Sequence, residues 1–124
     1  MYERELDNLT AFLKLASRPM LWTANVSAIV DMEKNWARLE AAMDLAGGRA
    51  NFKPMLGIYM WDYLTNKTDI PHELMEHQLS VGLDLLRSGR VHDLIFLGST
   101  IVDFDLRGVQ RSREWIAAHK DEQL

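Results

Sequence analysis

The sequence predicts an α/β protein built on parallel strands, with elements in the order α-β-α-β-α-β-α. Three short apolar runs indicate the strands; they begin at Pro19, Pro54 and Asp93, about 35 and 39 residues apart. Each run is followed by a polar turn and a stretch with helical periodicity. This is the period of β/α units in barrels and doubly wound sheets. Three units are fewer than a closed barrel needs, so we expect a partial barrel of TIM type, or a sheet whose edges a partner completes.

Length and composition limit the classes of protein to consider. The 124 residues have room for one domain, 1–124, and 48% apolar with 26% charged residues is ordinary for a globular chain. The net charge of −4, without a Lys/Arg cluster, argues against nucleic-acid binding. The lack of cysteine excludes disulfides and thiolate metal sites. Neither a signal peptide nor an apolar run of roughly 20 residues is present, so we expect no membrane partner.

The first half of the chain is predicted to hold two helices and two strands. A helix is expected over residues 2–17, with Leu6, Leu9, Phe12, Leu13 and Ala16 on one face. A short buried strand is expected over 20–25. Asp31 is a plausible N-cap for a second helix that runs to about Ala46, where Gly47-Gly48 supply the stop. The second strand is expected over 55–61.

The second half repeats this pattern. Acidic residues and a proline over 69–73 predict the start of a helix that continues to about Arg87, and Gly89 ends it. The near-continuous apolar character of 91–98 predicts a strand buried on both faces. Asp105 is expected to cap a last helix that reaches about His119 and is anchored by Val109, Trp115 and Ile116.

The candidate site residues follow the three predicted strands, because parallel β/α folds bind ligands at the carboxyl ends of their strands. They are Trp22 and Thr23 after the first strand, Tyr59, Trp61 and Asp62 at the second, and Ser99 and Asp103 after the third. Aromatic rings stack on the apolar face of a sugar, and carboxylates bind hydroxyl groups or assist glycosidic chemistry. These residue types therefore favour a carbohydrate site, although Trp22 and Trp61 are also consistent with core packing.

Asp62 is the best catalytic candidate. It directly follows an apolar run and lies between two aromatic residues, where loss of hydration would raise its pKa. It could serve as a general acid or base, as a nucleophile or as an acceptor for a hydroxyl group, or it could simply cap a turn. Asp103 is more typical of a helix cap. Gly98-Ser99-Thr100 could bind an anion at a helix start, but a plain turn is the commoner outcome.

We predict no metal and no cofactor. Glu73 and His77 are four residues apart, but the pattern lacks the second histidine of a zinc-binding HExxH helix. For His77 and Gln78 we expect a polar contact from helix to strand, or a surface pair.

Residues from about 54 to 116 resemble the last part of (β/α)8-barrel domains in a group of poorly characterised bacterial proteins similar to glycoside hydrolases. The matching segments are Gly57-Ile58-Tyr59-Met60-Trp61-Asp62-Tyr63, Met75-Glu76-His77-Gln78-Leu79, Gly89-Arg90, Ile95-Phe96-Leu97 and Asp103-Phe104-Asp105-Leu106. The resemblance implies that the three strands are the last three of such a barrel. Glycosidases need two carboxyl groups, and this chain offers one convincing candidate, Asp62.

Three functions remain open from the sequence. The first is a carbohydrate-active, glycoside-hydrolase-like barrel fragment that uses Asp62, with Trp22, Tyr59 and Trp61 as sugar platforms. The second is a non-catalytic α/β module that binds carbohydrate or a partner protein. The third is a self-associating scaffold in which strand edges pair between subunits. The expected partners are accordingly a carbohydrate, a missing barrel half or further copies of the chain.

Overall fold

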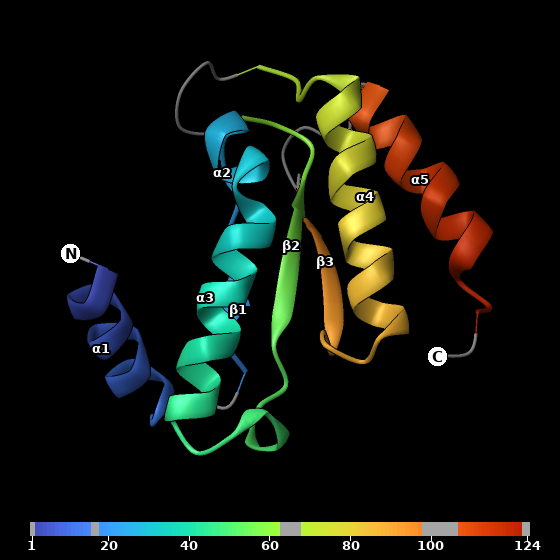
Figure 1. Cartoon of the computed structure of the whole chain (residues 1–124). Helices are drawn as coiled ribbons and strands as arrows, with labels where there is room; N and C mark the ends of the chain where they lie inside the picture. Colours follow the sequence, from blue (N-terminus) through green and yellow to red (C-terminus); the bar gives the residue numbers. More distant parts are fainter. Residues whose placement is uncertain (1, 16–17, 63–67, 98–106, 123–124) are drawn as a thin grey trace.

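The computed structural model describes residues 2–15, 18–62, 68–97 and 107–122, with only the backbone described for 2–5. Its elements follow one another as α1 Tyr2–Leu13, β1 Met20–Leu21, α2 Val26–Val30, α3 Met32–Leu45, the 3-10 turn η1 Arg49–Asn51, β2 Met55–Tyr59, α4 His72–Arg87, β3 Asp93–Leu97 and α5 Arg107–His119 (Figure 1).

The three strands form one parallel sheet in the order β1-β2-β3. Met20 is opposite Met55 at one end of the sheet, and Tyr59 is opposite Leu97 at the other. The predicted α/β class with parallel strands is therefore confirmed. The sheet is open in this chain, so its membership of a larger barrel stays a prediction. Among the described residues, no helix is long and apolar enough to cross a bilayer.

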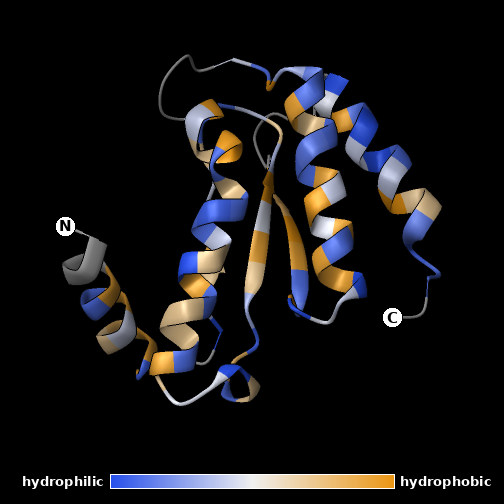
Figure 2. Ribbon diagram, in the orientation of Figure 1, coloured by the Kyte–Doolittle hydropathy of each residue, from blue (hydrophilic) through white to orange (hydrophobic). Residues whose placement is uncertain are grey.

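The helices form a single layer on one face of the sheet (Figure 1). Contacts join α3 to β1 and α4 to β2, while α1 packs beside α3 and α5 beside α4. Leu56 and Ile58 of β2 point into this layer and are fully buried, in one cluster with Trp36 of α3 and Leu79 of α4. In Figure 2, β2 and β3 are largely hydrophobic, whereas the helices mix hydrophobic and hydrophilic residues. The hydrophobic core thus lies between sheet and helices.

Several predicted boundaries shift, most of all around the first strand. Pairing ends at Leu21 rather than at residue 25, because Asn25 caps an extra helix, α2. The Asn25 side-chain oxygen accepts a hydrogen bond from the Ala28 N–H at 2.9 Å, as an N-cap does. Asp31 lies between α2 and α3 and makes no capping bond with its side chain. The predicted stops are confirmed: φ is +123° at Gly47, +101° at Gly48 and +72° at Gly89.

Three predictions of burial are wrong. β3 is only partly buried along its whole length, because it is an edge strand with helices on one side. Phe12 in α1 and Ile116 in α5 are 58% and 41% exposed, since these outer helices touch the rest of the molecule along narrow stripes. Val109 and Trp115 are buried as predicted.

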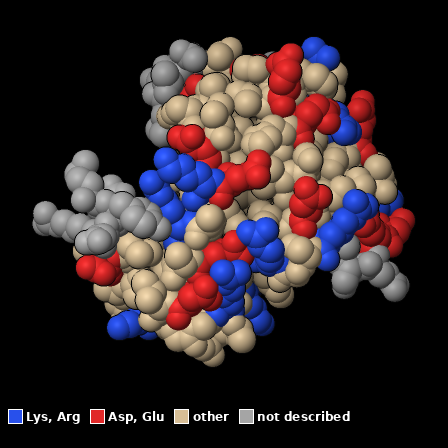
Figure 3. Space-filling model, in the orientation of Figure 1, with Lys and Arg blue, Asp and Glu red and all other residues tan. Residues whose placement is uncertain are grey.

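A buried carboxylate ties three segments together. Glu40 of α3 is almost fully buried, and it pairs with Arg49 of η1 at 3.1 Å and with Arg90 after α4 through two hydrogen bonds. The Arg90 guanidinium holds the pKa of Glu40 below its usual range. Arg49 also binds the exposed Asp44 at 2.9 Å. Figure 3 shows charges of both signs interspersed over this face of the molecule.

We expect Glu40→Ala to lower the free energy of unfolding by about 2 kcal/mol, because two guanidinium groups lose a largely desolvated acceptor. Asp44→Ala is the matched control, since it removes an exposed partner of the same Arg49 and should cost less than about 0.5 kcal/mol. Urea unfolding of both variants measures the difference. Equal losses would show that the burial of Glu40 adds nothing to the pair.

Candidate functional site

The sheet has a second face on which none of the described helices packs. Side chains alternate along a strand, so Met55, Gly57 and Tyr59 point away from Leu56 and Ile58. Their partners in register on β1 and β3 point the same way. We call this the open face; its apolar side chains are Met20, Met55, Tyr59, Ile95 and Leu97. None of these five belongs to the core cluster or to the residues packed against it.

Gly57 forms the floor of the open face. A Cβ placed there would lie 2.9 Å from both the Leu97 Cδ1 and Met20 Cε atoms, and 3.0 Å from the Tyr59 ring. Because real Cβ atoms essentially never have neighbours closer than 3.0 Å, a side chain at position 57 would force these neighbouring side chains to move. Side chains from all three strands therefore meet above Gly57, and only glycine leaves room for them.

Beyond Leu21, β1 no longer pairs with β2, and side chains supply hydrogen bonds to the β2 backbone instead. The Thr23 hydroxyl donates to the Gly57 carbonyl at 3.3 Å. Gln78 of α4 accepts from the Tyr59 N–H at 2.8 Å and donates to the Tyr59 carbonyl at 2.9 Å. Both residues are fully buried. The expected contact from helix to strand is thus confirmed for Gln78, whereas His77 lies 3.6 Å from Glu33 of α3.

The predicted aromatic residues have different environments. Trp22 directly follows β1 and is 68% exposed. Tyr59 ends β2 and is buried on the open face. Trp61 is partly buried and packs against the core cluster, in agreement with the core interpretation that the sequence left open. The candidate with a ring available to a ligand is therefore Trp22.

Asp62 is fully buried just beyond β2. Its backbone N–H donates to the Thr68 carbonyl at 2.8 Å, and Trp61 pairs antiparallel with Asp69. The chain thus returns alongside itself and brings a second carboxyl-bearing residue, Asp69, next to the segment that carries Asp62. The other two candidates, Ser99 and Asp103, lie outside the described residues.

Sequence reasoning missed Asp69 as a member of this region, because an acidic residue ahead of a helix is an ordinary helix-start signal. Burial raises the pKa of Asp69, although the Ile70 N–H and the charge of Arg107 act in the opposite direction. Its Oδ1 atom is buried, has no hydrogen-bond partner among the residues that the structure describes, and lies 3.3 Å from the position of a Cβ at Gly108 in the first turn of α5. The described residues contain no group of three acidic or histidine side chains placed to hold a metal.

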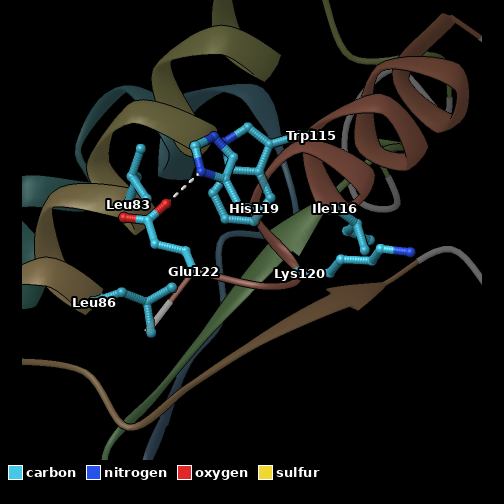
Figure 4. Close-up of a pocket in the computed structure, with 7 residues that line it drawn as sticks. All are labelled: Leu83, Leu86, Trp115, Ile116, His119, Lys120 and Glu122. Carbon is cyan, nitrogen blue, oxygen red and sulfur yellow. Dashed lines mark hydrogen bonds and ion pairs between the residues drawn. The ribbon is translucent and has the colours of Figure 1, made fainter. Parts of the chain in front are cut away.

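A small pocket of about 110 Å³ lies between α4 and α5, away from the strand ends (Figure 4). The Trp115 and His119 rings lie 4.7 Å apart at its wall. The His119 Nδ1 atom lies 2.7 Å from the carboxylate of Glu122, which also accepts from Arg87 at 2.7 Å. Arg87, and then His119, lower the pKa of Glu122 to about 2. This cluster secures the end of α5 against α4.

Comparison with known proteins identified no relative of this chain. No family model, no curated protein and no solved structure matches the chain.

For Asp69 we expect Asp69→Asn to stabilise the fold at neutral pH. A pKa raised by burial means that the unfolded chain ionises first, so Asp69 costs stability as pH rises from about 3.8 through the folded value. The gain of Asn over Asp should therefore shrink towards zero below that range. Urea unfolding at acidic and neutral pH tests this, since all other groups are shared. A variant less stable at neutral pH would mean that the charge on Asp69 is favourable.

For Glu122 we expect a carboxyl titration midpoint of about 2 by NMR in the wild type. Arg87→Gln should raise this midpoint towards the ordinary value, because the largest cause of the shift is removed. Lys53→Gln, which also removes one exposed positive charge but is not among the groups that shift the pKa of Glu122, is the control and should leave the midpoint in place. An unchanged midpoint in Arg87→Gln would contradict the pairing.

Proposed function

We propose that this chain forms the carbohydrate-binding end of a barrel-like α/β unit of glycoside-hydrolase type. The observation that carries the proposal is the exposed ring of Trp22 directly after β1, the strand next to β2, whose carboxyl end leads to the buried Asp62. A large exposed tryptophan is costly to leave in water, and its flat face suits the C–H face of a pyranose ring.

The roles of the neighbouring residues follow from their places. Trp22 is the stacking platform. Tyr59 lies on the open face, and its ring packs above Gly57. Asp62 follows the end of β2 and is fully buried in this chain; we propose it as the carboxylate that, in a complete site, accepts a sugar hydroxyl or acts in catalysis. Thr23 and Gln78 position the end of β2 through its backbone.

Hydrolysis of a glycosidic bond requires more functional groups than sugar binding does. Glycosidases place two carboxyl groups on either side of the scissile bond. Asp69 packs towards the start of α5. Our proposal therefore assigns sugar binding to this chain, and turnover to an assembly in which further β/α units add the second carboxyl group.

We expect Trp22→Ala to weaken binding of a soluble oligosaccharide by about 10-fold or more, because one stacked ring contributes about 1 to 3 kcal/mol in comparable contacts. The measurement is isothermal titration with a panel of cello-, xylo-, malto- and chito-oligosaccharides. Asp62→Asn should weaken binding of the same oligosaccharide if the Asp62 carboxylate accepts hydrogen bonds from its hydroxyl groups.

Phe12→Ala and Leu45→Ala are the matched controls, since both remove an exposed apolar side chain from the helical layer. They should leave sugar binding unchanged. Wild-type protein that binds none of the panel would refute the carbohydrate proposal and favour the non-catalytic, protein-binding alternative. Sugar binding that survives Trp22→Ala would refute the role of Trp22 as the stacking platform.

A further inference from the structure

We infer that the pocket between α4 and α5 binds a small carboxylate with a branched aliphatic body. The pocket has a volume of about 110 Å³. The residues that line it are Leu83, Leu86, Trp115, Ile116, His119, Lys120 and Glu122 (Figure 4). Leucine, isoleucine and tryptophan side chains make its interior apolar. The pocket lies away from the strand ends, so it is independent of the proposed sugar site.

The apolar walls of the pocket are held in place by the core. Trp115 of α5 is almost fully buried, and its ring packs against Phe96 of β3 with 5.8 Å between the ring centroids. Leu83 and Leu86 of α4 pack against the core cluster. Ile116, by contrast, is 41% exposed. The pocket is therefore a preformed apolar hollow with an exposed hydrophobic side chain at its rim, as is typical of sites for small ligands.

The charges that line the pocket favour an anion. The carboxylate of Glu122 is already engaged, because it accepts from Arg87 and lies 2.7 Å from the His119 Nδ1 atom. Among the acidic side chains that the structure describes, none forms an ion pair with Lys120. The Lys120 N–H donates to the Ile116 carbonyl at 2.8 Å, so the two residues lie one helical turn apart. An apolar hollow beside this ammonium complements a ligand with an apolar body and a negative head.

Glu122 and Lys120 line different sides of the pocket. In Figure 4 the carboxylate of Glu122 is turned towards His119, whereas the ammonium of Lys120 extends past Ile116 on the other side. A carboxylate head placed at Lys120 therefore avoids the negative charge of Glu122. The flexible four-carbon stem of lysine lets its ammonium follow the head of the ligand.

The volume limits the apolar body to about four carbon atoms. An apolar cavity of about 150 Å³ holds benzene. The 110 Å³ between α4 and α5 therefore has room for a smaller group, such as an isobutyl group. 3-Methylbutanoate combines an isobutyl group with a carboxylate and is the probe for this site.

The first test is a titration of the whole chain with 3-methylbutanoate, followed by NMR. We expect saturable shifts of the Trp115 indole and of the Leu83 and Leu86 methyl groups, with a dissociation constant on the order of millimolar. Acetate should bind at least about 10-fold more weakly, because each buried carbon contributes about fourfold in affinity. 3-Methylbutylamine, which has a similar body and a positive head, should bind at least about threefold more weakly.

Two variants locate the ligand. Ile116→Trp places a larger side chain at the rim, and by filling the pocket it should weaken binding of 3-methylbutanoate at least about 10-fold. Val30→Trp is its control, since it adds the same ring at an exposed apolar position on α2. Lys120→Gln should weaken binding of 3-methylbutanoate about threefold and reduce the preference for it over the amine. Lys53→Gln, which removes an exposed lysine that does not line the pocket, is the control for Lys120.

The site would be overturned by the absence of saturable shifts well above millimolar concentrations, by equal affinity for 3-methylbutanoate and 3-methylbutylamine, or by binding that Ile116→Trp leaves unchanged. Circular dichroism and thermal melts establish that each variant is folded. Trp22→Ala should leave carboxylate binding intact, and Ile116→Trp should leave oligosaccharide binding intact. Failure of one proposal is therefore distinguishable from failure of the other.

Discussion

Every part of this molecule depends on one geometrical constraint: parallel strands must be joined by crossovers, and right-handed crossovers that step in the same direction place their helices on the same side of the sheet. With the order β1-β2-β3, α3 and α4 therefore cover one face, and the core that includes Leu56 and Ile58 forms there. The chain has no further crossover among its described elements with which to cover the other face. The open face and the strand-end site are both consequences.

The short pairing between β1 and β2 explains why side chains form hydrogen bonds with the β2 backbone where a neighbouring strand would otherwise do so. β1 pairs over two residues only, so the backbone of β2 would lose partners as it approaches the site. Buried backbone groups need hydrogen bonds, and Thr23 and Gln78 supply them to Gly57 and Tyr59. At the end of β2 an amide from α4 thereby takes the place of β1, while β3 pairs with the other edge.

The sequence predicted the parts that depend on local chemistry. Apolar runs at a regular period predicted three parallel strands, and Gly47, Gly48 and Gly89 predicted where chain segments turn. The sequence could not predict the length of β1, because Asn25 suits a loop, a strand end or a helix cap equally well. It also could not predict the exposure of β3, Phe12 and Ile116, because an apolar residue does not reveal whether anything packs against it.

The candidate site shows the same division. Position after a strand was enough to find Trp22 and Asp62. Which ring would be exposed, and which would join the core as Trp61 does, depends on tertiary packing. Asp69 joins the region only because Trp61 and Asp69 pair antiparallel, and this contact leaves no pattern in the sequence.

Gly57 has a consequence for how the strands respond to one another. The Met20 Cε and Leu97 Cδ1 atoms both lie 2.9 Å from the position that a Cβ of Gly57 would take, so side chains from β1 and β3 occupy the space that a side chain of β2 would need. A larger residue at position 57 would therefore have to displace side chains of both outer strands at once. The single residue type at this position thus couples the packing of all three strands.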